Sequence, residues 1–579
     1  MRGIPSIAFL RRIALCGAAA AAVGLSACGG GGGGGGTGVG PPPPDPGASA
    51  PLPSKAQAAR FLRQATFGAT AAEIDRVAQI GYARWLDEQM ALPPTLHQPA
   101  VPYFSDPFTP KLFGTLPVQS SFWRQAATAP DQLRQRLMFA LSEILVISVG
   151  DMNVITYPRG VASYMDTLAA GSLGNYRQLL EGVALHPMMG LYLSHLGNRK
   201  EDPASGRVPD ENFAREVMQL FSIGVEELNA DGSPRTDASG RPLETYGNDD
   251  VIGLARVFTG WNWHAPAPTD EYFFADYSNP FFFPAAADPE RDIRPMRFYP
   301  QHHSTSEKRF LGTTIAANTD APTSLRIALD RLASHPNVGP FIGRQLIQRL
   351  VSSNPSPAYV GRVAAAFADN GAGVRGDMKA VVRAVLLDAE ARADPAPGST
   401  RSGKLKEPIL RISAWMRAFN VRSTSGAWAY YITGDPVTTI GQTPLQSPSV
   451  FNFFRPGYVP PQSEAGRAGM VVPEMQITSE TTVASYLNVI ESTVGYFGTG
   501  FLLDLNTDYA AEMALADDPP ALVDRIDLLL AAGAMSPETK ALMREAIESV
   551  PAGSLYYREN RARLAVLFAM ASTDFLVEK

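Results

Sequence analysis

Apolar side chains recur at helical spacing along most of the chain from Lys55 onward, and this period limits the fold more than any other feature. Residues 70–73 (Thr-Ala-Ala-Glu) form a capping-box sequence, and Ile74, Val77 and Ile80 share one face behind it. A second apolar stripe lies within residues 131–149. Further helices are predicted over residues 210–224, 248–260, 324–333, 338–351, 357–368, 378–389, 406–419, 473–494, 520–532, 537–549 and 554–570.

Strand signals are sparse, and only residues 296–299 and 308–311 are predicted to pair, as a short hairpin. Strands and helices do not alternate, so a parallel sheet is not expected. We therefore predict a mainly α fold: a large multi-helix globular body with long irregular loops and at most a short β-hairpin. Residues 240–300 and 428–462 are the long irregular stretches, and loops of that length are usually functional or disordered.

The first 27 residues have the pattern of a lipoprotein signal peptide. Arg2, Arg11 and Arg12 form a positive start before an apolar stretch, residues 13–25, which is shorter than the roughly 20 residues a membrane span needs. The stretch leads into Leu-Ser-Ala-Cys at residues 25–28, which resembles the bacterial lipobox. By that resemblance Cys28 becomes a lipid-carrying N-terminus; the alternative is ordinary cleavage beside an incidental cysteine.

Residues 28–54 are predicted to be a tether between the lipid anchor and the folded body. Glycines fill residues 29–36 and give flexibility, whereas the prolines at 41–44 form a stiffer spacer. The helical body is expected over residues 55–579, with a sub-boundary near 395–405 left open. Gly29 after the cysteine is typical of transfer to the outer membrane, so we expect an exported outer-membrane lipoprotein on the periplasmic or the surface face.

Charge and motifs exclude several classes of protein. The chain has 50 basic and 56 acidic side chains, which argues against nucleic-acid binding. The signatures His-Glu-x-x-His, Gly-x-Ser-x-Gly and Ser-x-x-Lys are absent from the sequence. Residues 371–376 match Gly-x-Gly-x-x-Gly but follow a helical segment, so they indicate a turn with Asp377 capping the next helix. The seven histidines have no ligand partner at helical spacing, so metal and cofactor are left unassigned.

The densest polar cluster lies at residues 210–216. Glu211 and Arg215 are four positions apart and can touch on a helix, and Glu216 shares their arc opposite the apolar face. Two interpretations stay open. One is a solvated face with Asp210 as N-cap; the other is a buried carboxylate–guanidinium lattice that holds Glu211 or Glu216 for acid–base or ligand chemistry.

Asp250 lies in the first turn of the predicted helix 248–260, where an acidic side chain favourably meets the helix dipole. Trp261 and Trp263, beside His264, follow that helix. They are interpreted either as lining for a sugar or another flat ligand, or as core packing.

His302 and His303 are adjacent in the predicted hairpin. Neighbouring side chains on a strand point to opposite sides, so the two would not bind one metal ion together. Either one of them joins carboxylates from elsewhere in the chain, or both lie in a hydrogen-bonded turn.

Several segments, in this order, resemble the bacterial domain-of-unknown-function family 1800 (DUF1800). They are residues 60–68 (RFLRQATFG), 211–224 (ENFAREVMQLFSIG), 250–251, 255–256, 259–261 (TGW), 303, 307–312 (EKRFLG), 335–336 and 441–444 (GQTP). The resemblance covers nearly all of residues 55–579, although Ser304 stands where many members have Asp after the histidine. It implies a large, exported, mostly helical protein without an established biochemical role. It also implies a secreted partner of alkaline-phosphatase-like or sulfatase-like fold, since such proteins are often encoded beside family members.

Two functions are weighed on these grounds, besides a purely structural role in the envelope. The preferred one is an envelope-tethered lipoprotein that binds or assembles with a secreted partner or a surface polymer. The alternative is a hydrolase or lyase on an envelope or extracellular polymer. It would use Glu211 or Glu216 as general acid or base, with Arg215 orienting it and Asp250 and His303 completing the cleft.

The lipobox makes a direct prediction about Cys28. Mass spectrometry of the processed wild-type protein should show a diacylglycerol adduct on this residue, and the Cys28→Ala variant should lack it. An unmodified cysteine in the wild-type protein would contradict the assignment.

Overall fold

The computed structural model describes residues 51–102, 115–275, 288–394, 402–430, 433–494 and 504–579. Its contacts divide the chain into two units, Met1–Leu52 and Pro53–Lys579. The predicted signal peptide 1–27, Cys28 and most of the tether lie outside the described residues, as does part of the sub-boundary near 395–405. The fold described below is that of the second unit.

The mainly α fold is confirmed, with 24 α-helices and only short strands in the described ranges. The α-helices are α2 Lys55–Ala65, α3 Ala71–Ile80, α4 Tyr82–Ala91, α6 Thr115–Thr128, α7 Gln132–Ser142, α8 Pro158–Gly171, α9 Tyr176–Ala184, α10 Pro187–Tyr192, α11 Asn212–Gln219, α12 Asn248–Ala255, α13 Asp270–Phe273, α14 Ala321–Ser334, α15 Val338–Leu350, α16 Pro357–Ala368, α17 Met378–Leu387, α18 Ala389–Arg392, α19 Pro408–Ala418, α20 Glu464–Arg467, α21 Glu480–Val494, α22 Ala510–Ala514, α23 Pro519–Ala531, α24 Pro537–Glu548, α25 Tyr557–Ala571 and α26 Thr573–Leu576. Short 3-10 helices are η1 Gln98–Ala100, η2 Val154–Thr156, η3 Arg256–Phe258, η4 Pro300–His302 and η5 Pro473–Ile477.

The strands form four antiparallel pairs, and the predicted pairing of 296–299 with 308–311 is wrong. The pairs are β1 Trp261–Asn262 with β2 Arg297–Phe298, β3 Lys308–Phe310 with β4 Thr313–Ile315, β5 Lys404–Leu405 with β8 Val577–Glu578, and β6 Arg422–Ser423 with β7 Leu505–Asn506. Leu311 and Gly312 both have positive φ, so they form a tight two-residue turn that folds β3 back on β4. Because of this local turn, β3 pairs with β4 and not with β2, the partner that the sequence pattern predicted.

Helix caps follow the predicted chemistry at most of the positions singled out. The Asp377 carboxylate accepts from the Lys379 N–H and opens α17, as predicted. Thr70 accepts from the Glu73 N–H at the start of α3, but the Glu73 carboxylate binds Arg417 instead of closing the capping box. The predicted helix 210–224 ends at Gln219, and Gly224 follows with a positive φ.

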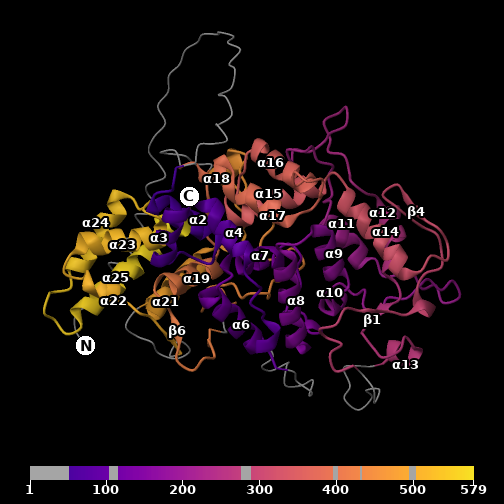
Figure 1. Ribbon diagram of the computed structural model, residues 1–579, viewed down its shortest axis with the longest axis horizontal. Coiled ribbons are helices and arrows are strands. Elements are labelled where there is room, and N and C mark those ends of the chain that lie inside the picture. The colour runs from indigo at the N-terminus through magenta and orange to yellow at the C-terminus, as the bar shows by residue number, and fades with distance from the viewer. Residues whose placement is uncertain (1–50, 103–114, 276–287, 395–401, 431–432, 495–503) are drawn as a thin grey trace, which may run out of the picture. The chain divides into compact units, whose positions relative to one another are not determined.

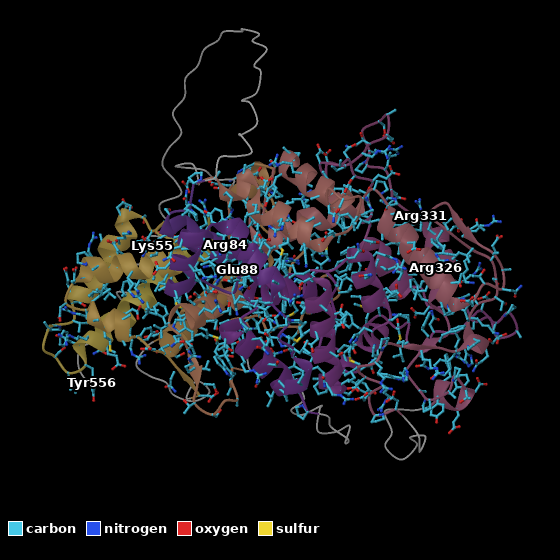
Figure 2. The ribbon with its side chains drawn as sticks, in the orientation of Figure 1. Lys55, Arg84, Glu88, Arg326, Arg331 and Tyr556 are labelled. Carbon is cyan, nitrogen blue, oxygen red and sulfur yellow. The ribbon has the colours of Figure 1, made fainter. Side chains whose placement is uncertain are left out.

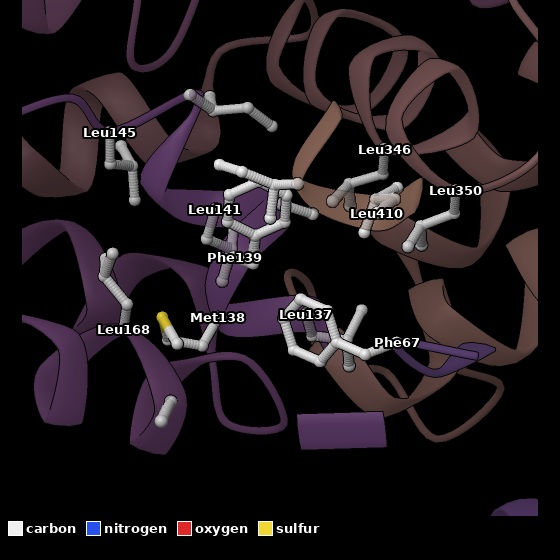
Figure 3. Packing of buried hydrophobic residues seen from close by; sticks show 14 of the residues in the cluster. Phe67, Leu137, Met138, Phe139, Leu141, Leu145, Leu168, Leu346, Leu350 and Leu410 are labelled. Atoms are coloured by element: carbon white, nitrogen blue, oxygen red, sulfur yellow. The ribbon is translucent and has the colours of Figure 1, made fainter. Parts of the chain in front are cut away.

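The core is organised around α7, every residue of which is buried. Figure 3 shows Leu137, Phe139 and Leu141 of this helix packed against Leu346 and Leu350 of α15. In Figure 1, α7 and α8 lie between the C-terminal helices, drawn in yellow, and the group around α11, α12 and α14. A helix buried on all sides draws its stability from packing more than from intrinsic helix propensity.

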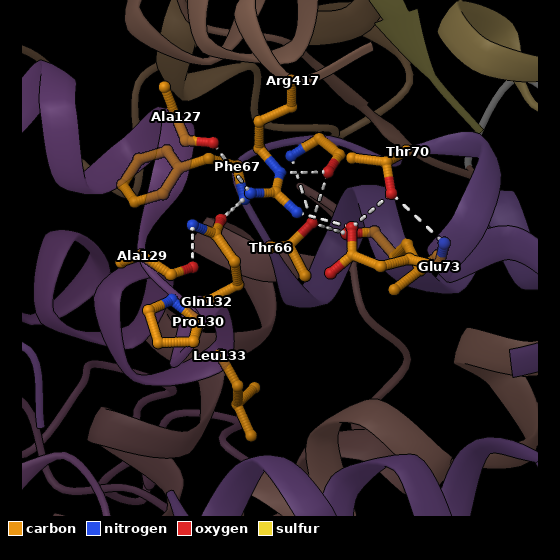
Figure 4. A network of polar contacts seen from close by, with 12 residues as sticks. Thr66, Phe67, Thr70, Glu73, Ala127, Ala129, Pro130, Gln132, Leu133 and Arg417 are labelled. Atoms are coloured by element: carbon orange, nitrogen blue, oxygen red, sulfur yellow. Dashed lines mark hydrogen bonds and ion pairs between the residues drawn. The ribbon is translucent and has the colours of Figure 1, made fainter. Parts of the chain in front are cut away.

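An arginine network fixes the turn that follows α2. The Arg417 guanidinium donates to the carbonyl oxygens of Gly68 (2.6 Å) and Ala127 (3.3 Å) and to Glu73 Oε2 (2.5 Å), as Figure 4 shows. A Cβ at Gly68 would lie 2.6 Å from the Ala414 Cα, so only glycine lets this turn meet α19. Residues 60–68 therefore act in helix packing.

Exposed charges cover the surface of these helices. Figure 2 marks Arg84 and Glu88 on α4, whose side chains approach to 3.6 Å one turn apart. Such an exposed pair contributes well under about 1 kcal/mol. Within the described ranges, no helix combines the length and the apolar character that crossing a bilayer requires.

The contact of α12 with β3 yields a stability prediction. A Cβ at Gly253 would lie 1.7 Å from the Arg309 carbonyl oxygen, so Gly253→Ala should lower the free energy of unfolding by about 1–3 kcal/mol. Gly361→Ala, in α16, is the matched control because the nearest atom would lie 3.7 Å away. Urea unfolding measures both, and equal midpoints for the two variants would contradict the close contact.

Candidate functional site

Glu211 and Arg215 of α11 form a surface ion pair. Arg215 Nη2 lies 3.2 Å from Glu211 Oε2, and about a third or more of each side chain is exposed. Arg215 also lines a cavity of about 240 Å³ beside Glu244 and Tyr246. Glu211 and Arg215 therefore fit the first of the two interpretations, in which this face of the helix is exposed to solvent.

Glu216, on the same helix, is in a different environment. The residue is buried, and its Oε2 has no hydrogen-bond partner among the described residues. Burial raises the pKa of this carboxyl, and the nearby charge of Arg215 opposes the rise. The solvated face therefore does not extend to Glu216, which stays a candidate for acid–base chemistry by environment alone.

Asp250 and His303 have structural partners. Asp250 accepts from the Gly247 N–H (2.8 Å) and the Leu311 N–H (2.6 Å), so it caps α12 and ties it to the β3–β4 turn. His303 Nδ1 lies 2.8 Å from the Thr259 carbonyl oxygen, and burial lowers the pKa of the imidazole to about 4.

The five residues proposed for a cleft are not gathered in the Arg215 cavity. Arg215 is the only one of them that lines it. His303 follows η4 and is not on a strand. Its neighbour Ser304 donates to Glu201 Oε1 at 2.9 Å, a contact that the sequence analysis missed because Glu201 lies a hundred residues away.

The aromatic candidates pack in the interior. Trp261 is buried in β1 and lies 5.8 Å from the Phe298 ring, and Trp263 lies 5.0 Å from the Tyr157 ring. His264 Nδ1 lies 2.6 Å from Asp288 Oδ2. Both tryptophan rings are buried, so neither offers an open face to a flat ligand.

In the part of the chain that the structure describes, no three His, Cys, Asp or Glu side chains gather in a way that could hold a metal ion.

A larger cavity of about 670 Å³ is lined by residues of α6, of the irregular stretch 428–462 and of the segment 476–482, and we call it the hydroxyl-lined groove. Its polar lining residues are Thr115, Thr433, Asp435, Thr443, Gln446, Gln476, Thr478, Ser479 and Thr482. Its remaining lining residues are Leu116, Gly434, Pro436, Gly441, Pro448, Phe453 and Ile477. From its length, the stretch 428–462 was predicted to be either functional or disordered, and no residue in it was singled out for a role. Thr443 belongs to the segment 441–444 that carries the family resemblance, which implies no role for it.

Short-range hydrogen bonds build the wall of the groove. The Asp435 carboxylate accepts from the Val437 N–H at 2.7 Å and closes a turn. Thr433 Oγ1 lies 2.8 Å from Thr443 Oγ1, and the Gln442 N–H donates to the Thr433 carbonyl oxygen at 2.9 Å. The two arms of the loop are therefore cross-linked at the floor.

Gln442 connects the groove to a buried charge cluster. Gln442 Nε2 donates to Glu407 Oε2 at 2.7 Å, and Gln442 Oε1 accepts from the Ile409 N–H at 3.1 Å. The members of the cluster are all buried: Arg63, Arg136, Glu143, Arg349, Lys404, Lys406, Glu407, Arg411, Glu474 and Glu578.

One carboxyl group in this cluster has a strongly shifted pKa. Burial, followed by the charge of Glu407, raises the pKa of Glu143 to about 8. Arg349 opposes the rise from 3.6 Å. The buried carboxyl of Glu143 therefore holds its proton at a higher pH than an exposed glutamate does.

Comparison with known proteins gives one match. A family model described as "Protein of unknown function (DUF1800)" matches residues 60–577. No curated protein and no solved structure matches the chain.

The raised pKa of Glu143 predicts a pH-dependent stability. The folded chain keeps a proton on Glu143 that the unfolded chain releases above about pH 4.5, so this group's contribution to stability falls as pH rises from about 5 to 8. Glu143→Gln mimics the neutral acid and should remove that loss. Urea midpoints at pH 5, 6, 7 and 8 should show the variant gaining on the wild type as pH rises. Glu88→Gln, at a solvent-accessible position of α4, is the control. Parallel curves for Glu143→Gln and wild type would contradict the raised pKa of Glu143.

Proposed function

We propose that this chain, which belongs to the DUF1800 family, binds a neutral, hydroxyl-rich surface polymer in the hydroxyl-lined groove. The observation that carries the proposal is the chemistry of the groove wall. Hydroxyl and carboxamide groups both donate and accept hydrogen bonds, so they match the hydroxyls of a saccharide in either direction. The groove volume of about 670 Å³ is in the range of ligand sites.

The charge of the groove wall narrows the class of polymer. Among the described residues that line it, Asp435 is the one ionisable residue, and no lysine or arginine is present. A phosphate- or sulfate-rich polymer would meet no cation among these described residues, whereas a neutral glycan needs none. Apolar side chains also make up a large part of the wall: Leu116, Pro436, Pro448, Phe453 and Ile477.

Binding is preferred, on geometric grounds, over a hydrolase or lyase that uses the Glu, Arg, Asp and His set of the sequence analysis. That alternative needs a positioned acid and base within reach of one substrate bond. Both Asp250 carboxylate oxygens are occupied by backbone N–H groups, and Glu211 is paired with Arg215 on the surface. The hydrolase or lyase alternative therefore has little support from its five proposed residues, which are Glu211, Arg215, Glu216, Asp250 and His303.

The N-terminal sequence indicates where in the cell the protein would bind its polymer. A lipid on Cys28 and the tether 28–54 would keep the groove beside the bacterial envelope, on its periplasmic or surface face, where polymers are concentrated. Assembly with a secreted partner of alkaline-phosphatase-like or sulfatase-like fold stays a second proposal, and its support is the family resemblance.

The groove makes a binding prediction. Gln446 is exposed in the groove, and removing its amide should weaken binding of a neutral polysaccharide by roughly fivefold, the effect of about 1 kcal/mol of lost hydrogen bonding. Affinity electrophoresis against dextran, β-glucan and mannan panels measures Gln446→Ala beside wild type. Gln79→Ala, on exposed α3, is the matched control. Wild-type migration that is unaffected by every neutral polymer would contradict the proposal.

A further inference from the structure

A second cavity, of about 320 Å³, lies against one face of α6. Leu116, Pro117, Ser121 and Arg124 line it, and their spacing places them on the same side of the helix. The loop that contains Trp428 closes the opposite side. Leu116 also lines the hydroxyl-lined groove, so the two cavities are neighbours along α6.

A chain of hydrogen bonds runs from this cavity into the interior. Gln135 Nε2 donates to the Thr95 carbonyl oxygen (2.9 Å) and to Asp131 Oδ2 (3.1 Å), which leaves Gln135 Oε1 to accept from His97 Nε2 at 2.9 Å. His97 Nε2 therefore carries the proton, and His97 Nδ1 presents a lone pair. Ser121 Oγ lies 2.9 Å from that Nδ1 and donates to it.

His97 is held in place by its backbone as well as by its ring. The N–H groups of His97 and Gln98 donate to the Asp166 carboxylate at 2.6 and 2.9 Å. Burial lowers the pKa of the imidazole to about 4, partly offset by the hydrogen bond to Gln135. The ring is therefore neutral at pH 7, as a base that accepts the serine proton must be.

Arg124 brings a positive charge to the same cavity. It lies three residues after Ser121, on the same face of α6, and is half-buried. Its guanidinium makes no hydrogen bond or ion pair within the described part of the chain. Ser121 and Arg124 thus line one cavity. His97, a neutral base oriented by Gln135, does not line it and lies buried behind Ser121.

We propose that Ser121 is a nucleophile that removes acyl groups from an esterified polymer. Ser121 Oγ forms a bond to the ester carbonyl carbon while its proton passes to His97 Nδ1, and Arg124 stabilises the oxyanion. The bond to the polymer oxygen then breaks, and that oxygen takes the proton from His97. Water, deprotonated by the same ring, releases the acyl group as a carboxylic acid and restores Ser121.

The assignment of the nucleophile stands on the contacts of Ser121 and His97. The polymeric nature of the substrate rests on the proposed function, because the neighbouring groove is the surface that would hold the polymer.

The first test uses the full chain and a fluorophosphonate probe. Peptide mass mapping of the wild-type protein should find one adduct on Ser121. Ser121→Ala should lose the adduct, His97→Asn should slow labelling by about 100-fold or more, and Ser163→Ala, on α8, should label like wild type. The labelling rate should rise with pH through about 4 and then stay level to pH 7, as the imidazole becomes neutral. An unlabelled wild-type protein, or an adduct on Ser120 instead of Ser121, overturns the proposal.

The second test separates this proposal from the groove. An O-acetylated neutral polysaccharide should release acetate with wild type and none with Ser121→Ala, while both proteins bind the polymer equally. Labelling of Ser121 without any polymer binding would overturn the proposed groove function and leave the nucleophile in place. Polymer binding without labelling would overturn the nucleophile and leave the groove function in place.

Discussion

The buried charge cluster is the constraint that the rest of the structure has to satisfy. Each ion taken out of water costs several kcal/mol unless an opposite charge and hydrogen bonds accompany it. Arg63, near the start of the fold, lies 3.6 Å from Glu578, near its end, and Lys404 of β5 pairs in register with Glu578 of β8. Helix α2 and strand β8 are therefore fixed to each other. Gln442, which donates to Glu407 of the cluster, connects the cluster to the groove.

The periodic part of the fold was predictable because the α-helix is a local structure. Apolar spacing and capping residues found most helices, whereas the pairing of β2 required knowing that Leu311 and Gly312 form a tight turn. The segments that carry the family resemblance mark close contacts: Gly68 meets Ala414, and a Cβ at Gly260 would lie 2.9 Å from the His303 backbone nitrogen. Such glycines identify a fold without identifying a reaction.

The candidate site was harder to predict because its partners are distant in sequence or belong to the backbone. Asp250 and His303 were chosen for their side-chain chemistry, yet both bind main-chain groups. The groove is lined by hydroxyl, carboxamide and apolar side chains from α6, the irregular loop and the segment 476–482, a set with no local signature. His97 and Ser121 meet through tertiary packing as well, because they come from separate elements of the chain.

Helix α6 connects the two cavities as a shared wall. Gln119 donates to the Pro444 carbonyl oxygen at 2.8 Å on the groove side, and Ser120 donates to the Ala427 carbonyl oxygen at 2.5 Å on the side of the smaller cavity. These bonds hold α6 to both loops, so the spacing between groove and serine is set by a rigid helix rather than by a loop. A rigid spacing is what an enzyme needs if a polymer held at one point is to present its ester at another. A protein that only binds the polymer does not need a fixed distance between two sites. The rigid wall formed by α6 therefore favours a protein in which the groove holds the polymer while Ser121 in the smaller cavity acts on it.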